Sequence, residues 1–103
     1  MGTEIKKWES NIANFGVILE GHRTTVHFTA TSPLEIIDFH TPCGCTSVTW
    51  NPEKRDLAIT YKAGAIPRHL GNVKAQSINK KVIVLYKDGS SEELSIVGIK
   101  KRK

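Results

Sequence analysis

Apolar and polar residues alternate one by one in several short stretches of this chain. In the stretch from Thr24 to Ala30, Val26 and Phe28 fall on one side and polar residues fall on the other. The stretches from Leu57 to Lys62 and from Val82 to Lys87 alternate in the same way. Because a period of two is typical of strands with one buried face, we predict three β-strands here.

A turn sequence joins the third of these stretches to a fourth. Asp88-Gly89 tolerates positive φ, and Leu94, Ile96 and Gly98 alternate with their neighbours after it. This pattern predicts a C-terminal β-hairpin.

Less regular segments complete the pattern. Further strand segments are expected at Leu34 to Phe39, Thr46 to Trp50, Ile5 to Trp8 and Ala13 to Phe15. Residues Gly64 to Ser77 contain Pro67 and two glycines, and we predict a long loop there, with a short helical turn as an option. No segment of ten or more residues keeps a helical period. The predicted fold is therefore all-β, an immunoglobulin-like β-sandwich of about seven strands.

The length and composition fit a single domain. The chain has 103 residues, of which 39% are hydrophobic and 24% charged, an ordinary balance for one small globular domain. We expect an N-terminal arm and edge strand at 1–14, the sandwich at 15–99 and a basic tail at 100–103. The longest apolar run, Val82 to Leu85, is far shorter than the roughly 20 residues that cross a bilayer. No apolar segment of a signal peptide follows Met1, so we expect no membrane partner and a place in the cytoplasm or in a virion.

Positive charge is concentrated at the C-terminus. The chain has a formal charge of +5, and its last four residues are Lys100, Lys101, Arg102 and Lys103. We expect a solvated, frayed terminus. The alternative is contact with nucleic acid through this tail alone, which would be weak and sensitive to salt.

The segment around the two cysteines offers several kinds of chemistry. His40, Cys43 and Cys45 lie within six positions, but a structural zinc site usually takes four such ligands. A disulfide across one residue would close a strained ring, so we expect two packed thiols and no metal. Cys43, Gly44 and Cys45 are then a structural turn, in which Gly44 permits a backbone angle or close approach closed to other residues. A metal or redox site at His40, Cys43 and Cys45 is the alternative.

Other residues are candidates for contact with a partner. Trp8 and Trp50 either fill the core or mark an interface, because tryptophan is common in both places. Pro67, Arg68 and His69 occupy the long predicted loop, where they are candidate interface residues. No phosphate-binding glycine loop, HExxH pair or GxSxG motif is present. We therefore expect neither an enzyme nor a cofactor.

Four motifs occur in an order that resembles a bacterial family of immunoglobulin-like domains of unknown function. They are FGVILEG at Phe15 to Gly21, TVHFTA at Thr25 to Ala30, PLEI at Pro33 to Ile36 and CGCT at Cys43 to Thr46. The family is related to the immunoglobulin-like domains of abnormal-spindle and hydin proteins and to major sperm protein. Lys81, Ile83 and Leu85, followed by Leu94, Ile96 and Gly98, match the end of the family pattern. The chain departs from it where Thr29 to Ser32 replaces the usual Asn-x-Gly connection.

The resemblance implies a non-enzymatic structural or adaptor module within a larger protein assembly. Small unfused domains of this kind are similar in architecture to accessory proteins of tailed-phage particles, whose partners are capsid or tail proteins. That comparison is an analogy of architecture. We expect contacts through an edge strand, the N-terminal arm and the loop from Ala63 to Ser77.

Overall fold

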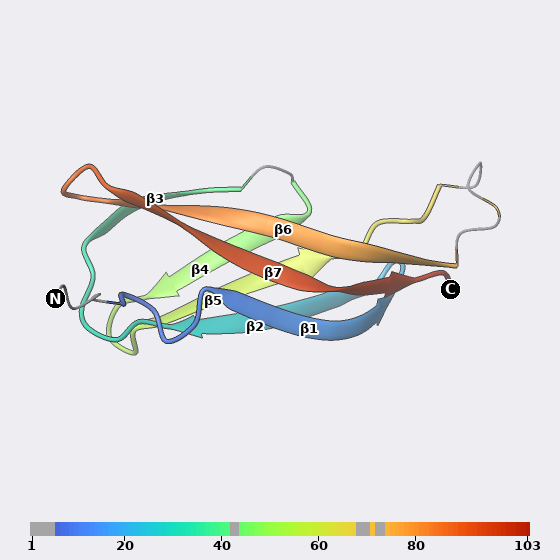
Figure 1. Ribbon diagram of the computed structural model, residues 1–103, viewed down its shortest axis with the longest axis horizontal. Coiled ribbons are helices and arrows are strands. Elements are labelled where there is room, and N and C mark those ends of the chain that lie inside the picture. The colour runs from blue at the N-terminus through green and yellow to red at the C-terminus, as the bar shows by residue number, and fades with distance from the viewer. Residues whose placement is uncertain (1–5, 42–43, 68–70, 72–73) are drawn as a thin grey trace, which may run out of the picture.

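Two β-sheets pack face to face in the computed structural model, which describes residues 6–41, 44–67, 71 and 74–103 (Figure 1). The strands are β1 (Ile12–Leu19), β2 (Arg23–Thr29), β3 (Ile36–His40), β4 (Thr46–Asn51), β5 (Asp56–Lys62), β6 (Ala75–Tyr86) and β7 (Ser91–Lys101). The prediction of an all-β, seven-stranded sandwich is confirmed.

Apart from β1, the strands divide between the two sheets as in constant-type immunoglobulin domains. The four-stranded sheet has the order β1-β7-β6-β3, and the three-stranded sheet has the order β2-β5-β4. Strand β1 pairs in parallel with β7, whereas the other strand pairs are antiparallel. In constant-type immunoglobulin domains the first strand lies beside the second. Here it has moved to the edge of the opposite sheet.

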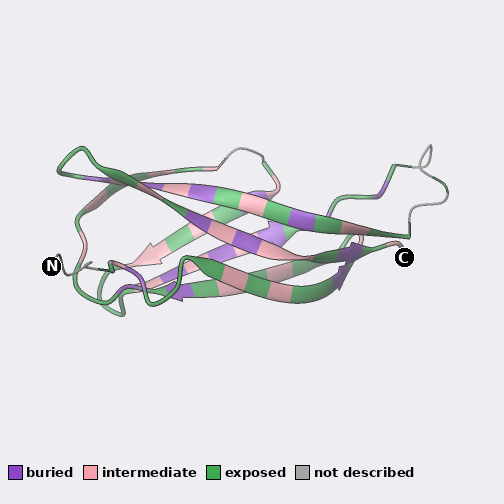
Figure 2. Ribbon diagram, in the orientation of Figure 1, coloured by how far each residue is buried: buried purple, intermediate pink, exposed green. Residues whose placement is uncertain are grey.

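The predicted alternation positions the core. Along β5, from Val82 to Tyr86 in β6 and from Leu94 to Ile96 in β7, buried residues recur at every second position, and Figure 2 shows the resulting bands on the ribbon. The larger cluster contains Trp8, Phe28, Ala30, Leu57, Ile59, Val82, Val84, Tyr86, Leu94 and Ile96. A smaller cluster contains Ile18, Tyr61, Ala63 and Ile78.

The C-terminal hairpin forms as predicted. Gly89 has a φ of 90°, and its N–H donates to the carbonyl of Tyr86 at 3.0 Å. The carboxylate of Asp88 accepts a bond from the N–H of Ser90 at 2.8 Å. The hydroxyl of Ser90 donates to the same carboxylate oxygen, and this bond, followed by the one from the N–H of Ser90, lowers the pKa of Asp88 below its usual value.

Several predicted boundaries are wrong. Strand β1 begins at Ile12 and continues to Leu19, so the boundary expected at Phe15 falls inside a strand. Strand β6 begins at Ala75, inside the predicted long loop. The described residues of that loop contain no helix, and the others lie outside the described residues.

The close pairing of β1 with β7 depends on a glycine. A Cβ atom at Gly98 would overlap the ring of Phe15, which occupies that space. Gly16 has a φ of 80°, and the β1 register shifts between Asn14 and Val17. The irregularity turns Ile18 into the core and leaves Val17 outside.

Candidate functional site

The two tryptophans lie together between the sheets. Trp8 is fully buried, and its ring meets the half-buried ring of Trp50 edge-on, with centroids 5.6 Å apart. The sequence left open whether Trp8 fills the core or marks an interface. It fills the core, so it contributes no exposed surface to an interface. A surface role for Trp50 stays a prediction.

A chain of hydrogen bonds holds Trp8 in place. Its Nε1 donates to the hydroxyl of Tyr86 at 2.9 Å, and that hydroxyl donates to Oε1 of Glu92 at 2.8 Å. Burial raises the pKa of Tyr86 far above its usual value, and the bond to Glu92 raises it further. The hydroxyl therefore stays protonated and keeps donating. Lys7 lies over the Tyr86 ring, with Nζ 3.9 Å from its centroid.

These contacts also fix the described part of the N-terminal segment. Trp8 forms a β-bridge with Ala30, and the N–H of Glu9 donates to the carbonyl of Thr29 at 2.9 Å. The N–H of Thr31 donates to the carbonyl of Lys7 at 2.9 Å. Residues 6–14 are therefore part of the sandwich and not a detached arm, and their contact with a neighbour stays a prediction.

The predicted loop interface is only partly described. Pro67 is exposed, and its carbonyl oxygen lies 3.5 Å from Nη2 of Arg102. Arg68 and His69 lie outside the described residues. Their part in an interface stays a prediction.

The cysteine turn differs from the sequence-based expectation. The sulfur of Cys45 is engaged in a disulfide, so the prediction of packed thiols is wrong for this residue. Ring strain raises the cost of a tight bridge without preventing it. Gly44 lacks a positive φ, and a Cβ there would meet nothing within 4 Å. Neither a special backbone angle nor a close approach therefore requires glycine at this position, so both predicted reasons are wrong.

The metal alternative loses one thiolate ligand, because the sulfur of Cys45 is engaged in a disulfide. Cys43 lies outside the described residues, and His40 is exposed on β3. Among residues 6–41, 44–67, 71 and 74–103, no three His, Cys, Asp or Glu side chains form a group that could hold a metal ion.

The C-terminal residues are not frayed. Lys100 and Lys101 belong to β7 and pair with Ile18 and Leu19 of β1. Lys100 is only 8% exposed, and the N–H of Arg102 donates to the carbonyl of Lys74 at 2.8 Å. The prediction of a frayed terminus is wrong, because strand pairing continues to Lys101. Lys101 and Lys103 are exposed to solvent, as predicted.

Glu20 connects this terminus to the loop after β5. Its Oε2 accepts a hydrogen bond from the N–H of Ile66 at 2.6 Å, and its Oε1 accepts one from Lys103 at 3.2 Å. The bond from Ile66, followed by that from Lys103, lowers the pKa of Glu20 below its usual value. The carboxylate thus stays charged at neutral pH and attached to both segments.

An aliphatic strip covers part of the outer face of the four-stranded sheet. Its members are Ile12, Val17 and Leu19 of β1 with Val97 and Ile99 of β7. The exposed fractions of Ile12 and Val17 are 61% and 58%, and Val17 lies directly opposite Ile99. A shallow hollow of about 450 Å³ crosses this strip, where Asn14, Ser77 and Asn79 add polar groups beside Val17, Val97 and Ile99.

Sequence reasoning missed this strip, although a signal was present. Val17, Ile18 and Leu19 are consecutive and apolar. Successive side chains of a strand point to opposite faces, so a strand with one buried face must leave some of them in solvent.

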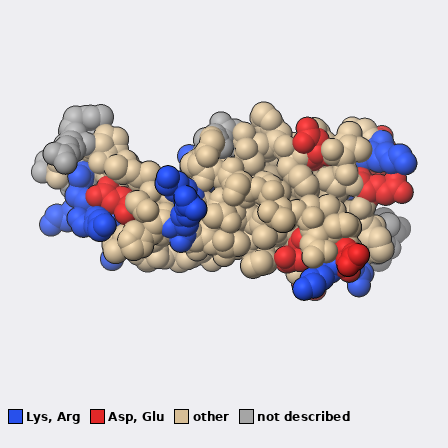
Figure 3. Space-filling view, turned by 180° about the vertical axis from the view of Figure 1, so that it is seen from behind, with Lys and Arg blue, Asp and Glu red and all other residues tan. Residues whose placement is uncertain are grey.

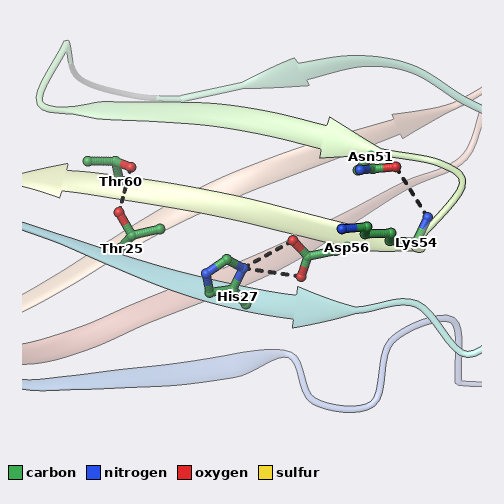
Figure 4. A network of polar contacts seen from close by, with 6 residues as sticks. All are labelled: Thr25, His27, Asn51, Lys54, Asp56 and Thr60. Carbon is green, nitrogen blue, oxygen red and sulfur yellow. Dashed lines mark hydrogen bonds and ion pairs between the residues drawn. The ribbon is translucent and has the colours of Figure 1, made fainter.

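The outer face of the three-stranded sheet is polar instead. The Thr25 and Thr60 hydroxyls are 2.9 Å apart, and Nδ1 of His27 lies 3.1 Å from Oδ2 of Asp56, as Figure 4 shows. At one end of the same face, Arg23 of β2 lies opposite Lys62 of β5. The two outer faces therefore differ in chemistry.

Comparison with known proteins supports the fold alone. No protein-family model matches the chain, and no curated protein matches it. A form of the SrpA adhesin from Streptococcus sanguinis with a single substitution is similar in structure, with a TM-score of 0.57 and 6% sequence identity over 89% of this chain and 57% of that chain. A second structure of the SrpA adhesin gives a TM-score of 0.49 and 9% identity over 87% of this chain and 53% of that one. The chain thus spans a little over half the length of these structures.

The described residues include no helix of the length and apolar character needed to span a membrane.

Proposed function

We propose that this protein is a non-enzymatic structural or adaptor module that binds a protein partner within a larger assembly. The contact surface is the aliphatic strip on β1 and β7. The observation that carries the proposal is the set of five branched aliphatic side chains that share this outer face, with Ile12 and Val17 more than half exposed.

The strip has the composition of a protein-binding surface. Contiguous exposed apolar side chains with polar neighbours are typical of interaction sites, and the buried centre of an interface is poor in charge while its rim is polar. The hollow across the strip is lined by valine, isoleucine, asparagine, serine and glycine, with no charged side chain. A partner would therefore bury aliphatic surface without having to desolvate a charge.

The strip also lies at a sheet edge. Strand β1 pairs with β7 on one side and ends the four-stranded sheet on the other. Ser10 and Asn14 blunt this edge, because Oγ of Ser10 accepts from the N–H of Ile12 and Oδ1 of Asn14 accepts from that of Gly16. Side-chain burial on the face, rather than addition of a strand to the edge, is accordingly the proposed mode of contact.

The most specific version places the module in a tailed-phage particle, as an accessory or decoration protein on the capsid or tail. Its support is the resemblance through the CGCT and FGVILEG motifs.

The test is co-sedimentation of the untagged protein with large particles from its native source, at low and at high salt, followed by mass spectrometry. We expect a fixed stoichiometry at both salt concentrations, because apolar contacts are not screened by salt. A Val17→Asp variant should lose this association. The matched control is Thr49→Asp, which adds the same charge to an exposed strand position of the other sheet and should associate normally.

Two outcomes would contradict the proposal. One is a protein that sediments alone in both conditions. The other is a protein that co-sediments with nucleic acid at low salt only and does so equally well as the Val17→Asp variant.

A further inference from the structure

Two positive side chains face each other on the outer surface of the three-stranded sheet. Arg23 begins β2, Lys62 ends β5, and the two are directly paired in the antiparallel register. Both are exposed. Like charges at directly opposed positions destabilise a sheet, so the pair needs an explanation.

No carboxylate within the described part of the chain neutralises this pair. The ion pairs there join His27 to Asp56, Lys81 to Glu93 and Lys87 to Glu35. Glu20, which follows β1, is instead bonded to the backbone of Ile66 and Lys103. Arg23 and Lys62 therefore lie together without an acidic partner among those residues.

A hollow of about 240 Å³ lies beside the two cations. It is lined by Arg23, Gly44, Cys45, Thr46, Ser47, Thr60 and Lys62. Ser47 lies opposite Thr60 in the register, so its hydroxyl shares a face with that of Thr60. A Cβ at Gly44 would meet no atom of the protein within 4 Å, so packing does not require the glycine and the rim stays open.

These groups suit a single negatively charged oxygen group. A guanidinium can donate two parallel hydrogen bonds to a carboxylate or phosphate, a lysine supplies a point charge, and serine and threonine hydroxyls can donate in addition. The hollow has room for one such group. Binding it would replace the repulsion between Arg23 and Lys62 with attraction to a shared anion.

The surrounding surface does not continue as a cationic track. Arg23 and Lys62 are the only Lys or Arg residues in β2, β4 and β5. Figure 3, seen from the side of this sheet, shows a blue patch between one charged end of the molecule and a largely uncharged centre. A nucleic-acid strand needs positive groups along successive phosphates, and this face offers one pair.

We infer that the hollow between Arg23, Lys62 and Ser47 is a binding site for a single oxyanion, either a carboxylate or a phosphate group. It lies on the sheet opposite the aliphatic strip and does not depend on the function proposed for that strip.

The test is an NMR titration of the isotope-labelled protein with sodium acetate and, separately, with sodium phosphate, at constant ionic strength set by sodium chloride. We expect saturable shifts at Arg23, Ser47 and Lys62, with a dissociation constant on the order of 1–10 mM, as befits one small anion on an open surface. The variant Arg23→Gln/Lys62→Gln should bind at least about 10-fold more weakly. Saturation by acetate identifies a carboxylate site, and saturation by phosphate alone identifies a phosphate site.

The controls separate this site from general charge effects. Lys87→Gln removes an exposed lysine from a different surface and should leave anion binding unchanged, as should Val17→Asp on the aliphatic strip. The melting temperature of Arg23→Gln/Lys62→Gln should equal or exceed that of the parent protein at low salt, since the variant removes a repulsion.

Three results would overturn the inference. The first is a linear shift with no saturation for either anion. The second is equal saturation in the Arg23→Gln/Lys62→Gln variant. The third is binding of a single-stranded oligonucleotide whose affinity falls as several powers of salt concentration, which would indicate a phosphate track instead of one site.

Discussion

At one end of the sandwich, Trp8, Trp50 and Tyr86 fill the space between the sheets, whereas at the other end a cluster of four buried residues closes it. The first end combines large rings with a buried hydrogen-bond chain to Glu92. The second has Ile18, Tyr61, Ala63 and Ile78, with Glu20 joining two backbone segments outside them.

The end that contributes most to stability is not the end that carries the proposed anion site. Large fully buried side chains dominate the free energy of folding in small domains, and they are concentrated at the Trp8 end. The Arg23 and Lys62 hollow adjoins the end with the smaller cluster, because Cys45 both lines the hollow and packs against that cluster.

The largest expected effect comes from removing the ring at the Trp8 end. Trp8→Ala should lower the free energy of unfolding by about 3–5 kcal/mol, because the cavity lies in a fully packed cluster. Ile78→Ala, in the smaller cluster, should lower the free energy of unfolding by about 2 kcal/mol. Urea unfolding of the two variants measures both values. Equal losses in the free energy of unfolding would show that the two ends contribute equally to stability.

A smaller effect isolates the hydrogen-bond chain. Tyr86→Phe should cost about 1–3 kcal/mol, since it leaves the buried N–H of Trp8 and one oxygen of Glu92 without this partner. Tyr61→Phe is the matched control, because Tyr61 is as deeply buried and belongs to the other cluster. We expect it to change stability by less than about 0.5 kcal/mol in chemical denaturation. Similar losses of stability for both tyrosines would show that the hydrogen bonds from Trp8 through Tyr86 to Glu92 add no specific stabilisation.

Substitutions at the neighbouring positions Ile18 and Val17 of β1 compare the effects of a polar side chain on the inner and outer faces of the sheet. Ile18→Thr should cost about 1–3 kcal/mol, because it places a hydroxyl in the small cluster. Val17→Thr should stay within about 0.5 kcal/mol of the parent protein, since Val17 is exposed, and should weaken association with the proposed partner. Thermal unfolding and co-sedimentation separate the two effects. A large stability loss for Val17→Thr would mean that the strip serves the fold instead.

The smallest effect concerns the charge of Glu20. Its folded-state pKa lies below the usual 4.5, so its stabilising contribution is present above about pH 4.5 and is lost as the pH falls through the folded-state pKa. Glu20→Gln should therefore unfold with a shallower dependence on pH below about 4.5. Asp88, whose pKa is also lowered, keeps part of the acid sensitivity in the variant. Identical pH profiles from pH 2 to 7 would show that the bonds to Ile66 and Lys103 do not favour the charged form.

Local sequence patterns were enough to predict the fold class. Strict alternation from Thr24 to Ala30 and from Leu57 to Lys62 gave the correct strands and buried faces, because side-chain direction in a strand depends only on its period of two. Asp88-Gly89 gave the hairpin turn for a similar reason, since positive φ at Gly89 is a local requirement.

What the sequence did not determine depends on pairing between distant residues. The same alternation left open which strand lies beside β1, whether Trp8 enters the core and whether Lys100 and Lys101 pair or fray. It also could not place Arg23 opposite Lys62, because 39 positions separate them in the chain. Register is set by contacts between segments remote in sequence, which only the assembled sheets provide. The sequence by itself thus determined the strands and their inner faces, and the tertiary structure decided what the outer faces bring together.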